Sequence, residues 1–528
     1  MVAHRTPARF DRSTTGASAP RPHACVIGAG LGGLAAAMRL AAKGYRVTVV
    51  DRLGGPGGRG TSISRGGHRF DLGPTIVTVP QVFRDLWAAC GMDFDRDVEL
   101  VGLDPFYEIR WPDGSRFTVR GSPEAMREEV RRLSPGDLTG WERFRRDAEV
   151  RYRFGFEELG RRPMHRLRDL VRVLPRFALL RADRSIHALA AARVRDERLR
   201  MALSFHPLFI GGDPFHVTSM YALVNHLESA FGVHYAMGGV AALAQAMQDA
   251  GARLGVTFHY GAEVAEILVQ GGRAAGLRLS DGRRIAADIV VSNADAGHTY
   301  DRLLPGTARR RWSRRRLGRL RWSMGLFVWY FGTRGTRGLW PDVGHHTILN
   351  GPRYRGLTRD IFIRGRLAGD MSLYVHRPSV TDPSCAPAGD DTFYALSPVP
   401  HLGHADPVDW SAEAEPYRRR VAEVLEASLL PGLRERIGES MVFTPETFRD
   451  RYLSPHGCGF SIEPRILQSA WFRPHNVSEE LPGLFLVGAG THPGAGLPGV
   501  VTSAEVLASL VPDAAAAPAQ GALDMAAE

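Results

Sequence analysis

The chain has 528 residues, of which 44% are apolar and 23% charged, and its formal net charge is +11. This composition excludes a wholly disordered chain, and the length predicts two lobes rather than one core. Lys43 is the only lysine, and it lies in the first predicted helix. No P-loop lysine is therefore present, and a Schiff-base enzyme would have to use Lys43 itself. The positive charge indicates either an acidic partner or simply an arginine-rich composition.

The cysteines and the two chain ends further restrict the class of protein that the sequence can encode. Four cysteines lie far apart without a CxxC or Cys/His pattern, so we expect no disulfide framework and no metal site; they are Cys25, Cys90, Cys385 and Cys458. Residues 1–21 lack the apolar core of a secretory signal, and with the Ala-rich segment 511–528 they are predicted to be disordered. We expect no membrane-spanning segment.

The first predicted elements form a βαβ unit, with strands at 24–27 and 46–50 around a helix at 31–43. A G-x-G-x-x-G sequence joins the first strand to the helix, which is typical of a pyrophosphate bound at a helix N-terminus. Asp51 ends the second strand, where a carboxylate accepts hydrogen bonds from ribose hydroxyls. The predicted cofactor contacts of this unit are Gly28, Ala29, Gly30, Gly33, Asp51 and Arg52.

Further glycine-rich segments favour FAD over NAD. The sequence Gly57-Gly58-Arg59-Gly60 follows soon after the ribose acid, and 71–75 follows in turn, so Gly58, Arg59 and Thr75 are predicted to reach the longer cofactor. Strands at 263–269, 275–279 and 288–292 are predicted to form a small meander. A last strand at 484–487 leads into a glycine run and a helix from about 498 to 510, whose N-terminus would stabilise a reduced flavin.

These blocks predict an α/β fold with a Rossmann-type FAD-binding domain and an inserted substrate-binding lobe. The FAD-binding domain would comprise 22–90, 230–305 and 475–510. The substrate- and membrane-facing lobe would comprise 91–229 and 306–474. Within the glycine run, Gly488, Gly490 and Val500 are the predicted cofactor contacts.

The run 483–503 resembles the C-terminal signature of the bacterial-type phytoene desaturases, which are FAD-dependent carotenoid enzymes of the amine-oxidase-like flavoprotein group. Further stretches similar to that family are 204–213, 292–295, 372–376, 397–401 and 468–475. The resemblance covers about 22–510 and points to the neurosporene-forming enzymes of purple photosynthetic bacteria.

The resemblance implies that phytoene gains successive C=C bonds by hydride transfer to flavin N5, while a base or water takes the proton. It places adenine near Val264 and the flavin ring near the C-terminal glycines. It also implies oxygen or a quinone as electron acceptor. The alternatives are a related carotenoid desaturase or isomerase, an amine oxidase, and a non-enzymatic isoprenoid-binding protein that holds no flavin.

No general base is evident from the sequence. Asp169 and Arg172 lie at i and i+3 on a predicted helix, and the family has an equivalent Asp-x-x-Arg. A carboxylate beside a fixed cation can take a proton, but the favoured explanation of the pair is an ordinary intrahelical salt bridge. Four further histidines are expected to be structural: His206, His376, His401 and His492.

Two arginine-rich segments indicate a surface partner. Eight arginines lie between Arg309 and Arg321 without a nucleic-acid-binding motif, so we expect a solvated or lipid-facing segment and no nucleic-acid partner. Moving a forty-carbon polyene through water would cost about 30 kcal/mol, at about 0.8 kcal/mol per methylene. The active site should therefore open onto a membrane, and we expect the protein at the cytoplasmic side of the cell membrane as a peripheral protein.

The predicted membrane contact is an interfacial helix within 167–184, kinked by Pro175, with a plain core helix as the alternative. Its apolar positions are Leu167, Leu170, Val171, Leu174 and Phe177, and its flanking arginines are Arg166, Arg168, Arg172, Arg176 and Arg181.

Overall fold

The computed structural model describes residues 21–516. The disorder predicted for 1–20 and 517–528 lies outside the described residues. For 511–516 the prediction was wrong, because this segment packs against the first helix. Val511 is buried, the Tyr45 hydroxyl donates to the Pro512 carbonyl at 3.1 Å, and Lys43 pairs with Asp513 at 3.0 Å.

The cofactor domain is built on a parallel five-stranded sheet. In spatial order its strands are β19 (Leu484–Leu486), β13 (Ile289–Ser292), β1 (His23–Ile27), β2 (Arg46–Val50) and β9 (Thr257–His259). The predicted βαβ unit is confirmed. The placement of 288–292 in the meander was wrong, because β13 pairs with β1 and β19. Its four residues are all buried, as the centre of a parallel sheet requires.

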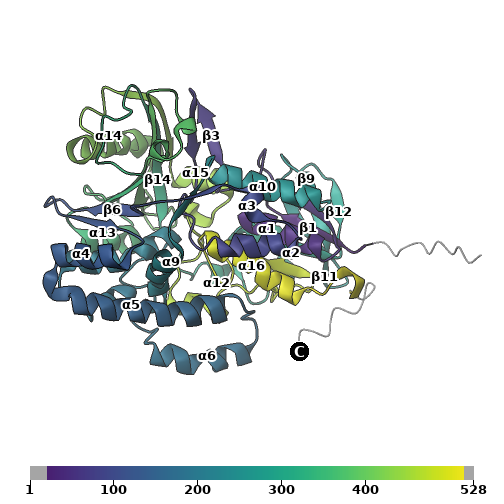
Figure 1. The fold of residues 1–528 in the computed structure, drawn as a ribbon. Helices are drawn as coiled ribbons and strands as arrows, with labels where there is room; N and C mark the ends of the chain where they lie inside the picture. Colours follow the sequence, from purple (N-terminus) through teal and green to yellow (C-terminus); the bar gives the residue numbers. More distant parts are fainter. Residues whose placement is uncertain (1–20, 517–528) are drawn as a thin grey trace, which may run out of the picture.

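Two layers cover this sheet. On one face α1 (Leu31–Ala42) packs between α10 (Gly239–Arg253) and α16 (Leu497–Leu510), as Figure 1 shows. On the other face lies the three-stranded meander of β10 (Val264–Gln270), β11 (Arg273–Leu279) and β12 (Arg284–Ala286). Ile267 and Leu277 of the meander share a core cluster with Cys25 and Val290 of the sheet.

The segment from Leu497 to Ala516 is long and apolar enough to cross a membrane by length and composition alone. Its helix α16 buries Val501, Ala504 and Leu507 in the same core cluster as α1. A core helix of a folded domain passes the same test of length and composition, and this burial identifies α16 as one.

The second lobe joins both insertions in one seven-stranded sheet. Its order is β18 (Ile437–Phe443), β14 (Gly325–Thr333), β17 (Asp391–Val399), β16 (Leu373–His376), β15 (His346–Leu349), β6 (Tyr107–Arg110) and β7 (Arg116–Val119). Only β15 and β6, which come from different insertions, pair in parallel. Alternate residues of β14 face two cores, with Phe327 and Trp329 packed toward α14 (Trp410–Ser428) and Val328 and Tyr330 in the core on the opposite face.

Helices from the first insertion lie below this sheet in Figure 1, and the outermost is α6 (Leu167–Leu179). The α-helices of the whole chain that have not yet been named are α2 (Gln81–Ala89), α3 (Phe94–Asp97), α4 (Pro123–Leu133), α5 (Leu138–Tyr152), α7 (Ile186–Ala191), α8 (Glu197–Ser204), α9 (Leu223–Phe231), α11 (Ala296–His298), α12 (Arg314–Leu317), α13 (Tyr354–Arg359) and α15 (Pro445–Tyr452). The remaining strands are β3 (Ser62–Arg65), β4 (His68–Asp71), β5 (Leu100–Gly102) and β8 (His234–Ala236).

Candidate functional site

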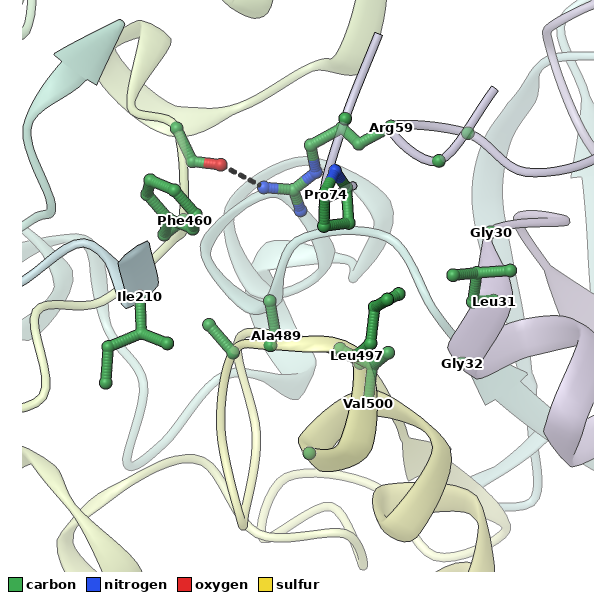
Figure 2. A pocket seen from close by; sticks show the side chains of 18 of the residues that line it. Gly30, Leu31, Gly32, Arg59, Pro74, Ile210, Phe460, Ala489, Leu497 and Val500 are labelled. Atoms are coloured by element: carbon green, nitrogen blue, oxygen red, sulfur yellow. Dashed lines mark hydrogen bonds between the residues drawn. The ribbon is translucent and has the colours of Figure 1, made fainter. Parts of the chain in front are cut away.

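A cavity of about 510 Å³ is lined by both lobes. The glycine loops of the cofactor domain form one end, and side chains of the seven-stranded sheet form the other. Figure 2 shows the glycine end with Gly30 and Gly32 on one side, Arg59 and Pro74 above, and Leu497 and Val500 of α16 below. Ten of the predicted cofactor contacts line it: Gly28, Gly30, Asp51, Arg52, Gly58, Arg59, Thr75, Val264, Gly488 and Val500.

The first glycine loop presents free backbone N–H groups to the cavity. Gly30 is the N-cap of α1, with no side chain capping the helix and no acidic residue in its first turn. Those N–H groups are therefore available to a phosphate. Gly33 has a packing role instead, because a Cβ there would lie 2.0 Å from the Gly28 carbonyl oxygen.

Asp51 is held at the end of β2 by two backbone N–H groups. Its Oδ2 accepts from Ala29 at 2.6 Å and its Oδ1 accepts from Leu53 at 2.7 Å. Burial raises the pKa of the carboxyl, while these two hydrogen bonds oppose the increase. Ala29 thus positions the acid rather than lining the cavity, and Asp51 keeps lone pairs free for ribose hydroxyls.

Arg52 and Arg59 both line the cavity, but their guanidinium groups are engaged by the protein. Arg52 donates to the carbonyls of Asp450 and Arg451, each at 2.7 Å, and pairs with Glu263 at 3.2 Å. Arg59 donates to the Gly459 carbonyl at 2.7 Å, the dashed line in Figure 2. Each arginine fastens the cofactor domain to the second insertion across the cavity.

The remaining glycine loops bring backbone against backbone. Gly58 has a φ of +57°, and a Cβ on it would lie 3.3 Å from the Cα of Gly30, so this loop rests on the first one. Gly490 does not line the cavity, and a Cβ there would meet the Ala296 Cβ at 2.8 Å. The missing side chain at position 490 allows the loop to pack closely against Ala296.

Asn293 is the site residue that the sequence analysis missed. A Cβ on Gly30, Gly32 or Gly488 would lie 2.6–2.8 Å from its amide, and the amide donates to the Gly28 carbonyl at 3.4 Å. Asn293 therefore connects the first and last glycine loops. Its signal was its place directly after buried β13, at the carboxyl end of a parallel strand, where such folds bind ligands.

At the other end, polar side chains line the wall. The Thr75 hydroxyl lies 3.0 Å from the hydroxyls of both Tyr374 and Tyr394. Tyr374 is also 2.7 Å from Nδ1 of His346. Asp71 lines the same region, and burial raises the pKa of its carboxyl to about 7.

Asp169 and Arg172 do not reach the cavity. Asp169 lies in the first turn of α6, where its Oδ2 accepts a hydrogen bond from the Arg166 N–H at 3.0 Å. Arg172 is exposed on the same helix, and no ion pair joins the two within the described residues. The predicted proton-transfer role stays a prediction without geometric support, and helix capping explains Asp169.

The four histidines expected to be structural each have protein partners. His206 contacts Glu228 at 3.1 Å, His376 contacts His345 at 3.0 Å, and His492 contacts the Leu159 carbonyl at 3.0 Å. His401 accepts from the Gly403 N–H at 3.0 Å. Of the four, only His492 lines the cavity.

The cavity extends to α6. Phe177 of α6 and Ile466 line it, while the opposite side of the helix exposes Leu167 by 63% and Val171 by 58%. Leu174 is exposed by 48%, and the helix continues through Pro175 to Leu179. The alternative of a plain core helix is wrong, because an apolar face points outward.

Elsewhere the surface is less distinctive. In the arginine-rich segment, Arg309 and Arg314 share Asp301 at 3.2 and 2.7 Å, and Arg311 pairs with Glu479 at 3.7 Å. These pairs neutralise part of the basic patch. All four cysteines are free thiols, as expected.

The fold and the site define an FAD-binding oxidoreductase. The family model "Flavin containing amine oxidoreductase" matches residues 31–511. An oxidoreductase from Methanosarcina mazei superposes with a TM-score of 0.60 at 20% identity, covering 91% of this chain and 98% of that one. Putrescine oxidase bound to putrescine superposes with a TM-score of 0.59 at 15% identity, covering 92% and 98%. At these identities the likeness shows the fold.

Sequence relatives are much nearer. A neurosporene-forming phytoene desaturase of Cereibacter sphaeroides is 70% identical over 93% of this chain and 95% of its own length. That of Rhodobacter capsulatus is 64% identical over 93% and 94%, and a lycopene-forming one of Pantoea ananas is 41% identical over 92% and 98%. The chain therefore belongs to the flavin-containing amine oxidoreductases and, within them, to the phytoene desaturase family. The predicted resemblance, fold class and FAD cofactor are confirmed.

Proposed function

We propose that this chain desaturates phytoene in carotenoid biosynthesis and forms neurosporene. The observation that supports the proposal is that the chain is 70% and 64% identical, over nearly its full length, to two neurosporene-forming desaturases. The cavity supports it, because apolar side chains continue from the cofactor loops into the second lobe. Among them are Leu208, Phe209, Ile210, Leu326, Leu396 and Phe460.

FAD, when bound, would accept the hydride that a substrate C–H bond gives up as each C=C bond forms. The glycine loops and the N-terminus of α1 would hold its pyrophosphate, and Asp51 would hold its ribose. Apolar walls keep the polyene against the cofactor and exclude water. Oxygen or a quinone is the proposed final electron acceptor, and a quinone would reach the protein from the same bilayer as the substrate.

We further propose that the protein works as a peripheral protein at the cytoplasmic side of the cell membrane. A substrate this apolar has to enter from a bilayer. The cavity reaches Phe177 on the inner side of α6, while Leu167, Val171 and Leu174 project outward beside exposed Arg168 and Arg172. Apolar side chains flanked by arginines suit an anionic membrane surface.

Expression in phytoene-accumulating cells tests the activity. Appearance of the neurosporene absorption spectrum is the expected result, and purified protein should carry flavin absorbance. An isomerase would leave the number of double bonds in phytoene unchanged, and a carrier protein would be colourless. Unchanged phytoene in the presence of FAD-loaded protein would refute the proposal.

Flotation with liposomes tests the location. We expect the protein to float with anionic vesicles at low salt and to be partly released at high salt, because exposed charges are screened. Protein that stays in solution under both conditions and still desaturates phytoene in the vesicles would contradict peripheral binding.

A further inference from the structure

A chain of hydroxyl groups runs along the cavity wall, from Thr75 of the loop that packs against Arg59 to tyrosines of the seven-stranded sheet. Tyr394, Thr75 and Tyr374 all line the cavity, and their oxygens follow one another at 3.0 Å. The last hydroxyl lies 2.7 Å from Nδ1 of His346, behind the wall. Each hydroxyl can accept one proton while it donates another, so the chain can transfer a proton without moving a heavy atom far.

Three buried imidazoles lie behind Tyr374. One nitrogen each of His345, His346 and His376 lies within 4.8 Å of the others. His376 and His345 share a hydrogen bond between their Nε2 atoms at 3.0 Å. Nδ1 of His345 contacts Thr381 at 2.6 Å, and Thr381 is half-buried at the surface. His346 thus lies between the cavity wall and a pair of imidazoles that reaches toward the surface, although its Nε2 has no hydrogen-bond partner among the described residues.

Three imidazoles are also a common ligand set for zinc or copper. The group contains no carboxylate or thiolate, so a divalent ion would bring its full charge into a buried site. Burying uncompensated charge costs several kcal/mol. His345 and His376 moreover already use their Nε2 atoms for each other. These observations favour transfer of a transient proton over a resident metal.

Burial keeps both partners of this transfer neutral at rest and allows a protonated His346 only as a transient species. Burial raises the pKa of Tyr374 and lowers the pKa of His346 well below its usual range, so the phenol and the imidazole are both neutral. A neutral phenol accepts a proton only if it loses its own at the same time. The nitrogen of His346 is the acceptor that makes this possible.

We propose that Tyr374 and His346 accept the proton that each desaturation step releases, which rests on the proposed function. One C–H bond of the substrate breaks and its electron pair leaves with hydrogen as hydride to the cofactor. The neighbouring C–H bond breaks, its electron pair forms the C=C bond, and its proton passes to the Tyr374 oxygen. The phenolic proton moves to Nδ1 of His346. It leaves through the other imidazoles and Thr381 when the His346 ring turns its Nε2, which has no hydrogen-bond partner among the described residues, toward them. A weak base suffices, because a C–H bond beside a carbon that is losing hydride is strongly acidic.

The test compares Tyr374→Phe with Tyr417→Phe, which is matched because it also removes one buried hydroxyl, bonded to Ser397 at 2.7 Å on the far side of the sheet. FAD-loaded proteins are mixed anaerobically with phytoene in liposomes, and flavin bleaching is followed in H₂O and D₂O. We expect Tyr374→Phe to bleach on the order of a hundredfold more slowly, with FAD content and melting temperature like those of the control. The solvent isotope effect of the wild type should disappear. His346→Asn, which keeps an acceptor but cannot take the proton, should be slow as well.

Wild-type protein that is not bleached by phytoene would refute the proposed function itself. With an active wild type, bleaching of Tyr374→Phe within about threefold of Tyr417→Phe would overturn the proton-transfer role. Loss of FAD from Tyr374→Phe would also overturn it, because the hydroxyl would then serve cofactor binding. So would a full equivalent of zinc or copper in the purified wild type, since the metal would occupy the imidazoles.

Discussion

The two ends of the cavity differ in what lines them: mainly backbone at one end and side chains at the other. At the cofactor end, the first and last glycine loops approach so closely that Cβ atoms on Gly30, Gly32 or Gly488 would collide with Asn293. At the substrate end, side chains from β16 and β17 meet Thr75 across the wall. Backbone makes the first end, and side chains make the second. The difference explains why one end is evident in the sequence and the other is not.

Gly30→Val should break the backbone end and have the largest effect. Its Cβ would lie 2.8 Å from the Asn293 amide, and the branched side chain would occupy the space of the pyrophosphate. We expect purified protein without flavin absorbance that does not regain it with added FAD. Gly54→Ala is the matched control, because no atom lies within 4 Å of a Cβ there. Ordinary FAD binding by Gly30→Val would show that the glycine loop is misassigned.

The substrate end contains a buried acid whose charge should be visible in pH-dependent stability. The pKa of Asp71 is about 7 in the folded protein and 3.8 ordinarily, so the neutral carboxyl stabilises the fold fully below pH 3.8. This stabilisation is lost as the pH rises through 7. At about 1.4 kcal/mol per pH unit, the free energy of unfolding should fall by up to about 4 kcal/mol over that range.

Urea unfolding between pH 4 and pH 8 measures the effect. Asp71→Asn should lose this part of the pH dependence, because an amide does not titrate in that range. The exposed Asp249→Asn on α10 should keep the wild-type profile. Identical pH profiles of Asp71→Asn and wild type would show that the carboxyl stays ionised in the fold.

Substitutions on the exposed apolar face of α6 test whether the substrate end of the cavity faces lipid. Replacing Leu167, Val171 and Leu174 together with Gln should weaken binding to anionic liposomes by about tenfold or more, because each buried side chain contributes up to about 2 kcal/mol. The matched control is Val269→Gln with Val424→Gln, since both valines are exposed on other elements. Equal flotation of the two variants would assign membrane contact to another surface.

Asp169→Asn should have the smallest effect. The residue lies away from the cavity, and an amide oxygen can still accept from the Arg166 N–H. We expect turnover within about threefold of wild type and a stability loss below about 1 kcal/mol. A loss of turnover on the order of a hundredfold with normal FAD content would instead restore the predicted catalytic role.

The sequence by itself determined the cofactor domain. The βαβ unit, Asp51 and the C-terminal run follow from short-range requirements: tight turns, free N–H groups and close backbone approach need glycine at fixed spacings. Such requirements are local and leave a pattern in the chain. Gly33 and Gly490, both predicted as cofactor contacts, do not line the cavity, and a Cβ on either would collide with the Gly28 carbonyl oxygen or the Ala296 Cβ. Their contact with the cofactor stays a prediction.

Only the tertiary structure decided the substrate end. Thr75, His346, Tyr374 and Tyr394 are separated by up to 319 residues. Strand pairing in the seven-stranded sheet brings the last three together, and Thr75 reaches the two tyrosines from a loop outside that sheet. No local sequence pattern predicts contacts between residues so far apart in the chain. The same holds for β13, whose buried residues fit a meander in sequence but pair with β1 in space. Periodicity reports which face of an element is buried, whereas the partner across that face depends on the whole fold.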